Sequence, residues 1–330
     1  MNQDPDAQPS TVREAIANLL RGLCMGCADV VPGVSGGTVA LILGIYERLV
    51  TAISNIDGSL VTRLRNRQWR QLAGHIDLLF LLALGMGIGT GVVVMSLVIN
   101  DLLTNHTTRS LTLAAFFGLI LASAVVLAKM IETVTAPQTA TCVVLGIVGV
   151  MFAYWVSGLH NAGGVAEPGY GYVFVCGGIA ICAMILPGIS GAMILLVLGI
   201  YVHLTEIPHN LLAGEHVGES LLTLVVFGAG CAISLIMFSK FLRWLLNRHH
   251  APTMAVLCGF MIGALRKLWP FQQDLTPEVE KFKHKRFELV WPDSFDSQVA
   301  GVLVAGAIAM AVVFIVDRQV RGAKRMHGDR

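Results

Sequence analysis

Long apolar stretches constrain this chain more than any other feature of its sequence. A helix needs about 20 mostly apolar residues to cross a lipid bilayer, and six segments approach or exceed that length. Of the 330 residues, 55% are hydrophobic and only 13% are charged, which is too little charge for a soluble domain. We therefore predict an all-α polytopic membrane protein. The predicted spans are residues 76–99, 111–131, 139–159, 220–241, 253–268 and 299–317.

Two more apolar stretches, residues 22–46 and 172–202, are interrupted by Pro-Gly and Ser-Gly. Basic residues accumulate in cytoplasmic loops. Arginines flank the first stretch on both sides, whereas the loops around the second are uncharged or acidic. We therefore expect each stretch to enter and leave the membrane on one face, as a re-entrant helical hairpin. By the same rule, both chain ends and loop 47–75 lie in the cytoplasm, while loop 203–219 lies outside. The alternation of the spans also puts loop 266–298 outside, although its basic residues fit the rule less well.

The second broken stretch repeats the first. With a shift of 155 positions, eleven of the twenty residues from Cys27 to Tyr46 are identical to those from Cys182 to Tyr201. Each half then contains one hairpin and three spans, so the second half begins on the opposite face and the two repeats have inverted topology. The predicted organisation is a disordered start (1–10), repeat 1 (11–159, opened by an interfacial amphipathic helix over 11–21), repeat 2 (172–317) and a basic cytoplasmic tail (318–330).

The duplicated break has a chemical use inside a membrane. An unpaired backbone polar group costs several kcal/mol in hydrocarbon, so irregular backbone survives there only when it is buried in protein or lines a polar cavity. The N-terminal ends of half-helices offer free N–H groups and partial positive charge to an anion. We expect the two breaks to meet and form an anion site; the alternative is that they are only tight packing turns. The breaks are Pro32, Gly33, Pro187 and Gly188, and the candidate ligands are Ser35, Gly36, Gly37, Thr38, Ser190 and Gly191.

Several charged residues lie close to the hairpins or in the spans. Asp29 stands in apolar surroundings, and an acid inside a membrane segment indicates function, so we predict that it couples a proton or sodium ion. The alternative is a structural carboxylate bonded to nearby N–H groups. Glu47 and Arg48 close the first hairpin, either as an interfacial ion pair or as gating residues. Further candidates for binding a phosphate are Arg266, Lys267 and Arg21; for the first two the alternative is snorkelling to the interface.

The stretches "MGCADVVPGVSGGTVALILGIYERL", "ILPGISGAMILLVLGIY" and "GFMIGALRKLWP" closely resemble the PopT family of polyprenyl-phosphate transporters, over roughly residues 11–318. The resemblance implies a bacterial inner-membrane protein that returns undecaprenyl phosphate, the lipid carrier of cell-wall sugars, from the outer leaflet to the inner leaflet. The family pattern maps onto Asp29, Pro32, Gly33, Ser35, Gly36, Gly37, Thr38 and Glu47, and in the second half onto Pro187, Gly188, Ser190, Gly191, Arg266 and Lys267.

Two other functions remain alternatives. An intramembrane polyprenyl-pyrophosphate phosphatase would need an arginine directly after the motif serine and a glutamate pair, and neither is present. A small-anion channel or transporter would suit paired half-helix ends equally well. The chain has no GxxxxGK[ST] motif, so uphill transport would use an ion gradient or trapping of the product. We expect no enzyme activity, no catalytic residue, no metal site, no nucleic-acid partner and no cofactor. The expected partners are undecaprenyl phosphate and membrane lipids, and the oligomeric state is left open.

Overall fold

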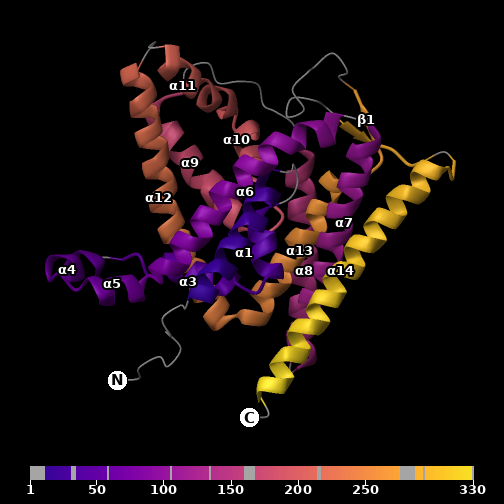
Figure 1. Cartoon of the computed structure of the whole chain (residues 1–330), viewed down its shortest axis with the longest axis horizontal. Helices are drawn as coiled ribbons and strands as arrows, with labels where there is room; N and C mark the ends of the chain where they lie inside the picture. The colour runs from indigo at the N-terminus through magenta and orange to yellow at the C-terminus, as the bar shows by residue number, and fades with distance from the viewer. Residues whose placement is uncertain are drawn as a thin grey trace. The chain divides into compact units, whose positions relative to one another are not determined.

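The computed structural model is helical almost throughout. It describes residues 12–30, 35–57, 59–104, 106–133, 135–159, 168–213, 217–275, 287–292 and 294–328, so the predicted disordered start lies outside the described residues. The helices are α1 (Val12–Val30), α2 (Gly36–Ile42), α3 (Tyr46–Ser54), α4 (Ser59–Arg65), α5 (Trp69–His75), α6 (Leu78–Thr104), α7 (His106–Ala128), α8 (Ala136–Gly158), α9 (Tyr170–Ile185), α10 (Gly191–Val197), α11 (Tyr201–Ala213), α12 (Val217–Arg248), α13 (His250–Ala264), the 3-10 turn η1 (Leu265–Leu268) and α14 (Ser297–Gly328) (Figure 1).

Among the described residues, six helices are long and apolar enough to cross a membrane, or up to seven if the bent pair α2–α3 counts as one span. Each of the six overlaps one predicted span, which confirms the prediction of an all-α polytopic membrane protein. They are Leu78–Val98, Thr108–Ala128, Ala136–Gly158, Val217–Arg248, His250–Leu268 and Ser297–Ile315.

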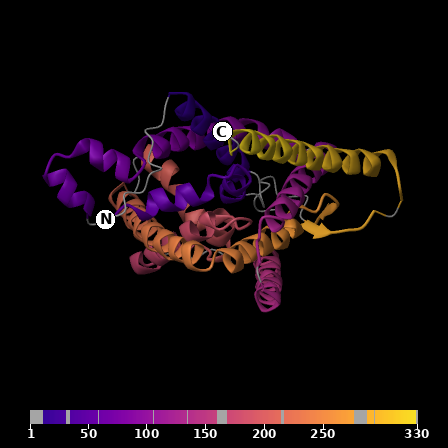
Figure 2. The same ribbon diagram turned by 90° about the horizontal axis from the view of Figure 1, so that it is seen from below.

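Several boundaries differ from the prediction. The amphipathic segment and the first half of the broken stretch form one continuous helix, α1. The predicted loop 47–75 contains α3, α4 and α5, and the predicted loop 203–219 contains most of α11. Helix α14 continues as one unbroken rod far into the predicted tail (Figure 2). The charge pattern marked these segments as polar and outside the bilayer, but charge alone does not distinguish a loop from a surface helix.

The chain divides into two compact units that do not follow the predicted repeats. Unit 1 takes residues 1–29, 35–92 and 159–250, and unit 2 takes residues 30–34, 93–158 and 251–330. Each unit therefore contains helices from both halves of the sequence. Unit 2 also holds the small sheet in the predicted loop 266–298, where β1 (Gln272–Asp274) pairs antiparallel with β2 (Phe287–Leu289) and Gln272 faces Leu289.

In unit 1, the same close helix contact occurs once in each half. A Cβ atom added to Gly87 of α6 would lie 2.1 Å from the carbonyl oxygen of Leu19 in α1, and one added to Gly230 of α12 would lie 2.1 Å from that of Phe174 in α9. Leu19 and Phe174 differ by the predicted shift of 155, whereas Gly87 and Gly230 differ by 143, because the first basic segment is longer. The repeat is thus present in the packing as well as in the sequence.

The thiol contacts beside these glycines repeat in the same way. Cys27 donates its thiol to the carbonyl oxygen of Gly91 at 3.6 Å, and Cys182 donates to that of Ser234 at 3.8 Å. Small residues allow helix backbones to approach closely in a membrane protein, where van der Waals packing replaces the hydrophobic effect between helices.

In unit 2, the close glycine contacts join helices from different halves of the sequence. A Cβ atom on Gly118 of α7 would lie 2.2 Å from the carbonyl oxygen of Gly306 in α14, and one on Gly259 of α13 would lie 2.2 Å from that of Gly146 in α8. Helix α7 of the first half therefore packs on α14 of the second, and α13 of the second half packs on α8 of the first. Neither half can complete these contacts alone.

The two broken stretches have matching local structure. Helices α2 and α10 each have seven residues and begin directly after Ser35 and Ser190. Each helix is followed by a leucine and then by a glycine with positive φ, Gly44 at +67° and Gly199 at +72°. This conformation favours glycine. The chain bends by 117° between α2 and α3 at the first of these glycines.

Helices α9 and α10 run antiparallel. A Cβ atom on Gly191, the first residue of α10, would lie 2.9 Å from the carbonyl oxygen of Ala180 in the last third of α9. At the other end, the hydroxyl of Tyr172 near the start of α9 donates to the carbonyl oxygen of Leu198, which follows α10, at 2.7 Å. The second broken stretch is therefore a helical hairpin. Its orientation in a membrane, and the inversion of the repeats, stay predictions.

The glycine contacts yield a paired prediction. Gly87→Ala and Gly230→Ala each place a methyl group against backbone that cannot rotate away, so we expect each to lower the free energy of unfolding by about 1–3 kcal/mol. Gly89→Ala and Gly228→Ala lie on the same two helices in open space, and alanine is intrinsically the better helix former. Thermal unfolding of the purified protein should lower the midpoint in the first pair only; equal midpoints in all four variants would contradict the packing.

Candidate functional site

The start of α2, which directly follows the first break in the sequence, contacts the second break and the end of α9 inside unit 1. The backbone N–H of Gly188 in the second break donates to Oγ1 of Thr38 in α2 at 2.9 Å. The hydroxyl of Ser35 donates to the carbonyl oxygen of Met184, near the end of α9, at 3.4 Å. Thr38 is 0% exposed and Ser35 is 2% exposed. Segments about 150 residues apart in the sequence are thus joined by buried hydrogen bonds, as expected if the breaks form one site.

Two glycines allow this approach. A Cβ atom on Gly37 would lie 2.7 Å from the carbonyl oxygen of Ile185, so only glycine lets the start of α2 lie against the end of α9. Gly188 has a φ of +83°, which orients its N–H toward Thr38 and which other residues rarely adopt. Pro187 beside it is buried. The corresponding Pro32 and Gly33 of the first break lie outside the described residues.

The first N–H groups of α2 already have partners within the chain. The N–H of Gly36 donates to Oδ1 of Asp29 at 2.6 Å, and the N–H of Gly37 donates to Oγ of Ser35 at 3.2 Å. Ser35 is the N-cap residue of α2 and makes the contact expected of a serine there, whereas Asp29 reaches the N–H of Gly36 from the end of α1. Asp29 thus accepts from one nearby N–H group, as the structural alternative expects, while its part in ion coupling stays a prediction. A phosphate could bind Gly36 and Gly37 only after displacing Asp29 and Ser35.

The second break differs from the first at its serine. Ser190 precedes α10 in extended conformation, as Ser35 precedes α2, but its side chain makes no capping hydrogen bond. It is half-buried, whereas Ser35 is buried. Of the two serines, Ser190 therefore has the hydroxyl that is available for a ligand, and the neighbouring Gly191 is fixed by packing against Met184.

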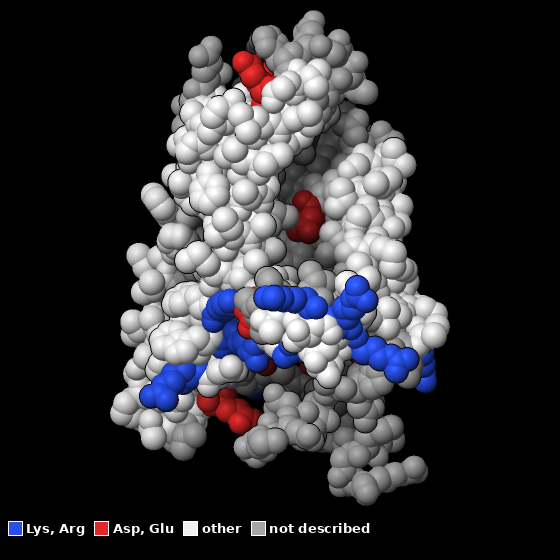
Figure 3. Space-filling model, turned by 90° about the vertical axis from the view of Figure 1, so that its left-hand side faces the viewer, with Lys and Arg blue, Asp and Glu red and all other residues white. Residues whose placement is uncertain are grey.

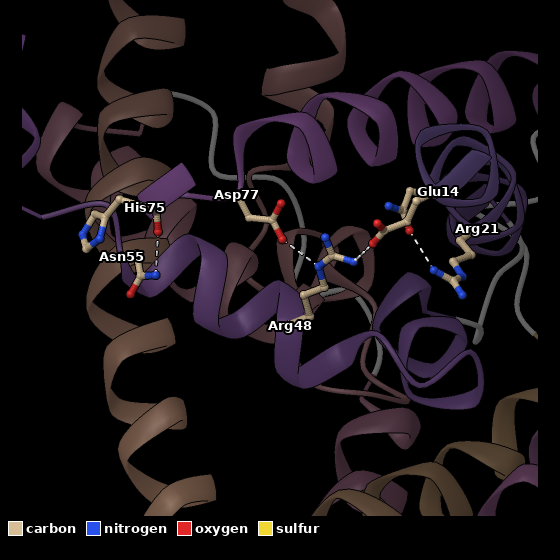
Figure 4. A network of polar contacts seen from close by, with 7 residues as sticks. Glu14, Arg21, Arg48, Asn55, His75 and Asp77 are labelled. Atoms are coloured by element: carbon tan, nitrogen blue, oxygen red, sulfur yellow. Dashed lines mark hydrogen bonds and ion pairs between the residues drawn. The ribbon is translucent and has the colours of Figure 1, made fainter. Parts of the chain in front are cut away.

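The residues that close the first hairpin form a different arrangement from the predicted pair. Arg48 donates to Oδ2 of Asp77 at 2.6 Å and to Oε1 of Glu14 at 2.5 Å (Figure 4). Its guanidinium also lies over the ring of Phe80, 4.4 Å from the ring centroid. Arg48 therefore connects α3 to α1 and to the residues at the start of α6, which suits a fixed position better than a moving gate.

Glu47 and Arg21 also have side-chain partners within unit 1. Oε1 of Glu47 lies 2.9 Å from Nε2 of His250, and among the described residues Glu47 and Arg48 form no ion pair with each other. Arg21 donates to Oδ1 of Asn18 at 2.8 Å (Figure 4). With a rise of 1.5 Å per residue, Arg21 stands about 12 Å before Asp29 along α1. The structure does not bring Arg21 to the joined breaks.

Arg266 and Lys267 belong to unit 2. Arg266 donates to the carbonyl oxygen of Tyr154 at 3.1 Å, and its guanidinium lies 4.4 Å from the centroid of the Tyr154 ring. The backbone carbonyl of Lys267 accepts from Nε2 of Gln272 at 3.0 Å. Both side chains are half-buried. Their part in binding a phosphate stays a prediction.

Sequence reasoning did not single out Arg109, which is 5% exposed in unit 2. Its Nη2 approaches the carbonyl oxygen of Gln272 at 3.5 Å, and its guanidinium lies 4.8 Å from the centroid of the Phe287 ring. In the sequence it stands just before an apolar span, where an arginine is normally assigned to a loop. Only the fold of the following β-strands shows that it is covered. Among the described residues, no group of three or more His, Cys, Asp or Glu is placed to hold a metal ion.

Comparison with known proteins agrees with the motifs. A family model described as undecaprenyl phosphate translocase-like matches residues 25–285. The chain is 39% identical over 261 residues to the polyprenyl-phosphate transporter of Vibrio cholerae serotype O1, covering 79% of this chain and 80% of that protein. It is 32% identical over 263 residues to the polyprenyl-phosphate transporter of Staphylococcus aureus, covering 77% of this chain and 86% of that protein. No solved structure matches the chain.

These matches confirm the resemblance inferred from the motifs. The names of the family and of both relatives are those of transporters and not of enzymes, which confirms the prediction that the chain is not an enzyme. The chain is a multi-pass membrane protein.

The contact between the breaks can be tested at Thr38. Thr38→Val removes the acceptor and leaves the buried N–H of Gly188 without its partner, which should lower the free energy of unfolding by about 1–3 kcal/mol. Thr38→Ser keeps the hydroxyl and should stay close to the unsubstituted protein. Thermal unfolding of the three proteins checks this; a Thr38→Val variant as stable as Thr38→Ser would show that the hydrogen bond contributes nothing.

Proposed function

We propose that the chain transports polyprenyl phosphate through the membrane, and the premise is that it belongs to the undecaprenyl phosphate translocase-like family. In this proposal it moves undecaprenyl phosphate from the outer to the inner leaflet of the bacterial cytoplasmic membrane, which returns the lipid carrier of the cell envelope for reuse. Both chain ends lie in the cytoplasm, as the distribution of basic residues favours.

The physical task is to carry a phosphate across about 30 Å of hydrocarbon. An unpaired charged group there is prohibitively unfavourable, so the phosphate needs hydrogen-bond donors along its path. The prenyl chain has no such need, and it can remain in the lipid while only the head group passes along the protein. Irregular backbone where two inverted repeats meet is a recurrent location for such a polar path in transporters.

The observation that carries the proposal is the buried contact between α2 and the second break, in which the N–H of Gly188 donates to Oγ1 of Thr38 at 2.9 Å. It supports one head-group site built from both halves of the chain. Within that site we assign different roles to the three hydroxyls. Ser190, which caps nothing, contacts the phosphate. Ser35 and Thr38, which are buried and hydrogen-bonded, hold the breaks in position.

Asp29 gives the site a means of ion coupling. Its carboxylate accepts from the N–H of Gly36 at 2.6 Å, so it occupies a position where a phosphate oxygen could also accept. A proton or sodium ion that neutralises Asp29 would weaken this interaction and release the N–H for the head group. Glu47 is the weaker candidate, because its side chain is 59% exposed and already contacts His250.

The first test measures transport. The purified protein is reconstituted in vesicles that contain polyprenyl phosphate, and movement is read as the loss of accessibility of the lipid phosphate to an enzyme added outside. Ser190→Ala should raise the half-saturating lipid concentration by about ten- to a hundredfold, because a hydrogen bond to a charged group contributes about 1.5–3 kcal/mol. The matched control is Ser239→Ala, which removes a buried hydroxyl without a hydrogen-bond partner among the described residues.

Several results would contradict this function. Vesicles that pass small anions but do not move the lipid phosphate would favour an anion channel. Release of inorganic phosphate from a polyprenyl pyrophosphate by the purified protein would favour a phosphatase. Equal transport by Ser190→Ala and Ser239→Ala would remove Ser190 from the site while leaving the transport activity itself intact.

The second test addresses coupling. Asp29→Asn keeps an oxygen that can accept from Gly36 but removes the charge, so transport by this variant should lose its dependence on pH and on the sodium gradient. Glu47→Gln, the matched control, should keep both dependences. If Asp29→Asn responds to pH and sodium as the unsubstituted protein does, Asp29 is a structural cap and does not couple an ion.

A further inference from the structure

Unit 1 contains an open cavity of about 370 Å³ away from the joined breaks, where the last turns of α12 meet the end of α3. Most of its lining comes from one helix, at positions 240, 243, 244, 247 and 248. Residues spaced by three, four, seven and eight positions lie on one face of a helix, so the cavity follows from the α12 sequence. It is lined by Ser54, Lys240, Arg243, Trp244, Asn247 and Arg248.

The cavity is strongly basic. Three of its lining side chains are cations, and in the described part of the chain no ion pair to a carboxylate is formed by any of them. Arg243 donates to Oγ of Ser54 at 3.1 Å and to Oδ1 of Asn55 at 2.5 Å. These partners fix the direction of the guanidinium but do not neutralise it.

The acidic residues of the surrounding elements are already paired. Glu14 and Asp77 both contact Arg48, and Glu47 contacts His250. On the face drawn in Figure 3, Lys and Arg side chains gather in one band, and the surface above the band is almost free of them. The three cations of the cavity are therefore available to an anion from outside the chain.

Aromatic side chains beside the cavity indicate where this anion comes from. Trp244 is 55% exposed and stacks on Phe241, which is 52% exposed, with 6.1 Å between ring centroids. Trp and Tyr concentrate at the membrane–water interface, at the level of the lipid head groups. The part of α12 that precedes Phe241 in the sequence is apolar and long enough to be part of a membrane span. The cavity thus lies beside exposed aromatic side chains, at the end of a helix that is long and apolar enough to cross a membrane.

We propose that this cavity binds the phosphate of an anionic membrane lipid, separately from the substrate path at the joined breaks. Basic pockets at the ends of membrane helices suit anionic head groups, and the fork of an arginine matches the geometry of a phosphate. The lipid holds the ends of α3 and α12 together by bridging Arg243, which already contacts α3, to Lys240 and Arg248. This site lies outside the transport reaction and does not depend on it.

The test uses binding to the purified full-length protein. A short-chain phosphatidylglycerol is titrated into the protein in a neutral detergent, and bound lipid is counted by native mass spectrometry. The double substitution Lys240→Gln with Arg248→Gln should weaken binding by on the order of tenfold or more, since each basic residue near the membrane surface contributes to attraction. The control is Arg65→Gln with Arg70→Gln, two exposed arginines outside the cavity, which makes the same change in net charge and should leave binding unaltered.

Further arms of the experiment separate the sources of phosphate. Inorganic phosphate that competes weakly with the lipid would support phosphate as the recognised group. Binding of inorganic phosphate without any binding of phosphatidylglycerol would overturn the lipid assignment, as would equal lipid binding by the two double variants. Thermal unfolding verifies that both variants are folded. Because the readout is bound lipid, a chain that fails to transport polyprenyl phosphate would still give a valid result.

Discussion

The rest of the structure depends on one constraint, which is that backbone polar groups of a broken helix in hydrocarbon must find partners inside the protein. The chain satisfies this constraint by hydrogen bonds among α1, α2 and the second break. Thr38 accepts from Gly188, Ser35 accepts from Gly37, and Asp29 accepts from Gly36. The N–H groups of Gly36, Gly37 and Gly188 are therefore hydrogen-bonded within the chain without a ligand. In the proposed mechanism, a phosphate can reach the free hydroxyl of Ser190 directly, but it can bind the N–H of Gly36 only by displacing Asp29, the one titratable group among these partners.

Close helix contact is the second determinant of this architecture. Glycine at 87, 118, 230 and 259 brings backbones together between helices that are distant in the sequence. In unit 1 each contact joins helices of the same half, whereas in unit 2 each contact joins helices of opposite halves. The duplicated sequence therefore does not form two separate domains. Both units require both halves, so a head-group site made from both breaks accords with the way the whole chain is assembled.

Charge is used in two ways in unit 1. Around Arg48, two carboxylates and an aromatic ring compensate the guanidinium and tie α3 to its neighbours. Around Arg243, the partners are neutral and two further cations share the same cavity. The first arrangement is complete within the chain. The second needs an anion, and its position beside exposed aromatic side chains points to the lipid surface rather than to the substrate path.

The sequence by itself determined the membrane class, the six spans, the duplicated break and the family, because these depend on local hydropathy and on residue identity. It also identified the six residues that directly follow the breaks, which are Ser35, Gly36, Gly37, Thr38, Ser190 and Gly191. It could not assign their roles: Ser35 and Ser190 read alike, and only packing leaves one hydroxyl bonded and the other available. It did not single out Arg109, and for Glu47 and Arg48 it left an ion pair and a gate as alternatives, because burial and partners come from segments far along the chain. The packing of first-half helices on second-half helices in unit 2 was likewise decided by tertiary structure. Hydropathy locates a span, but it carries no information about which helix a glycine will contact.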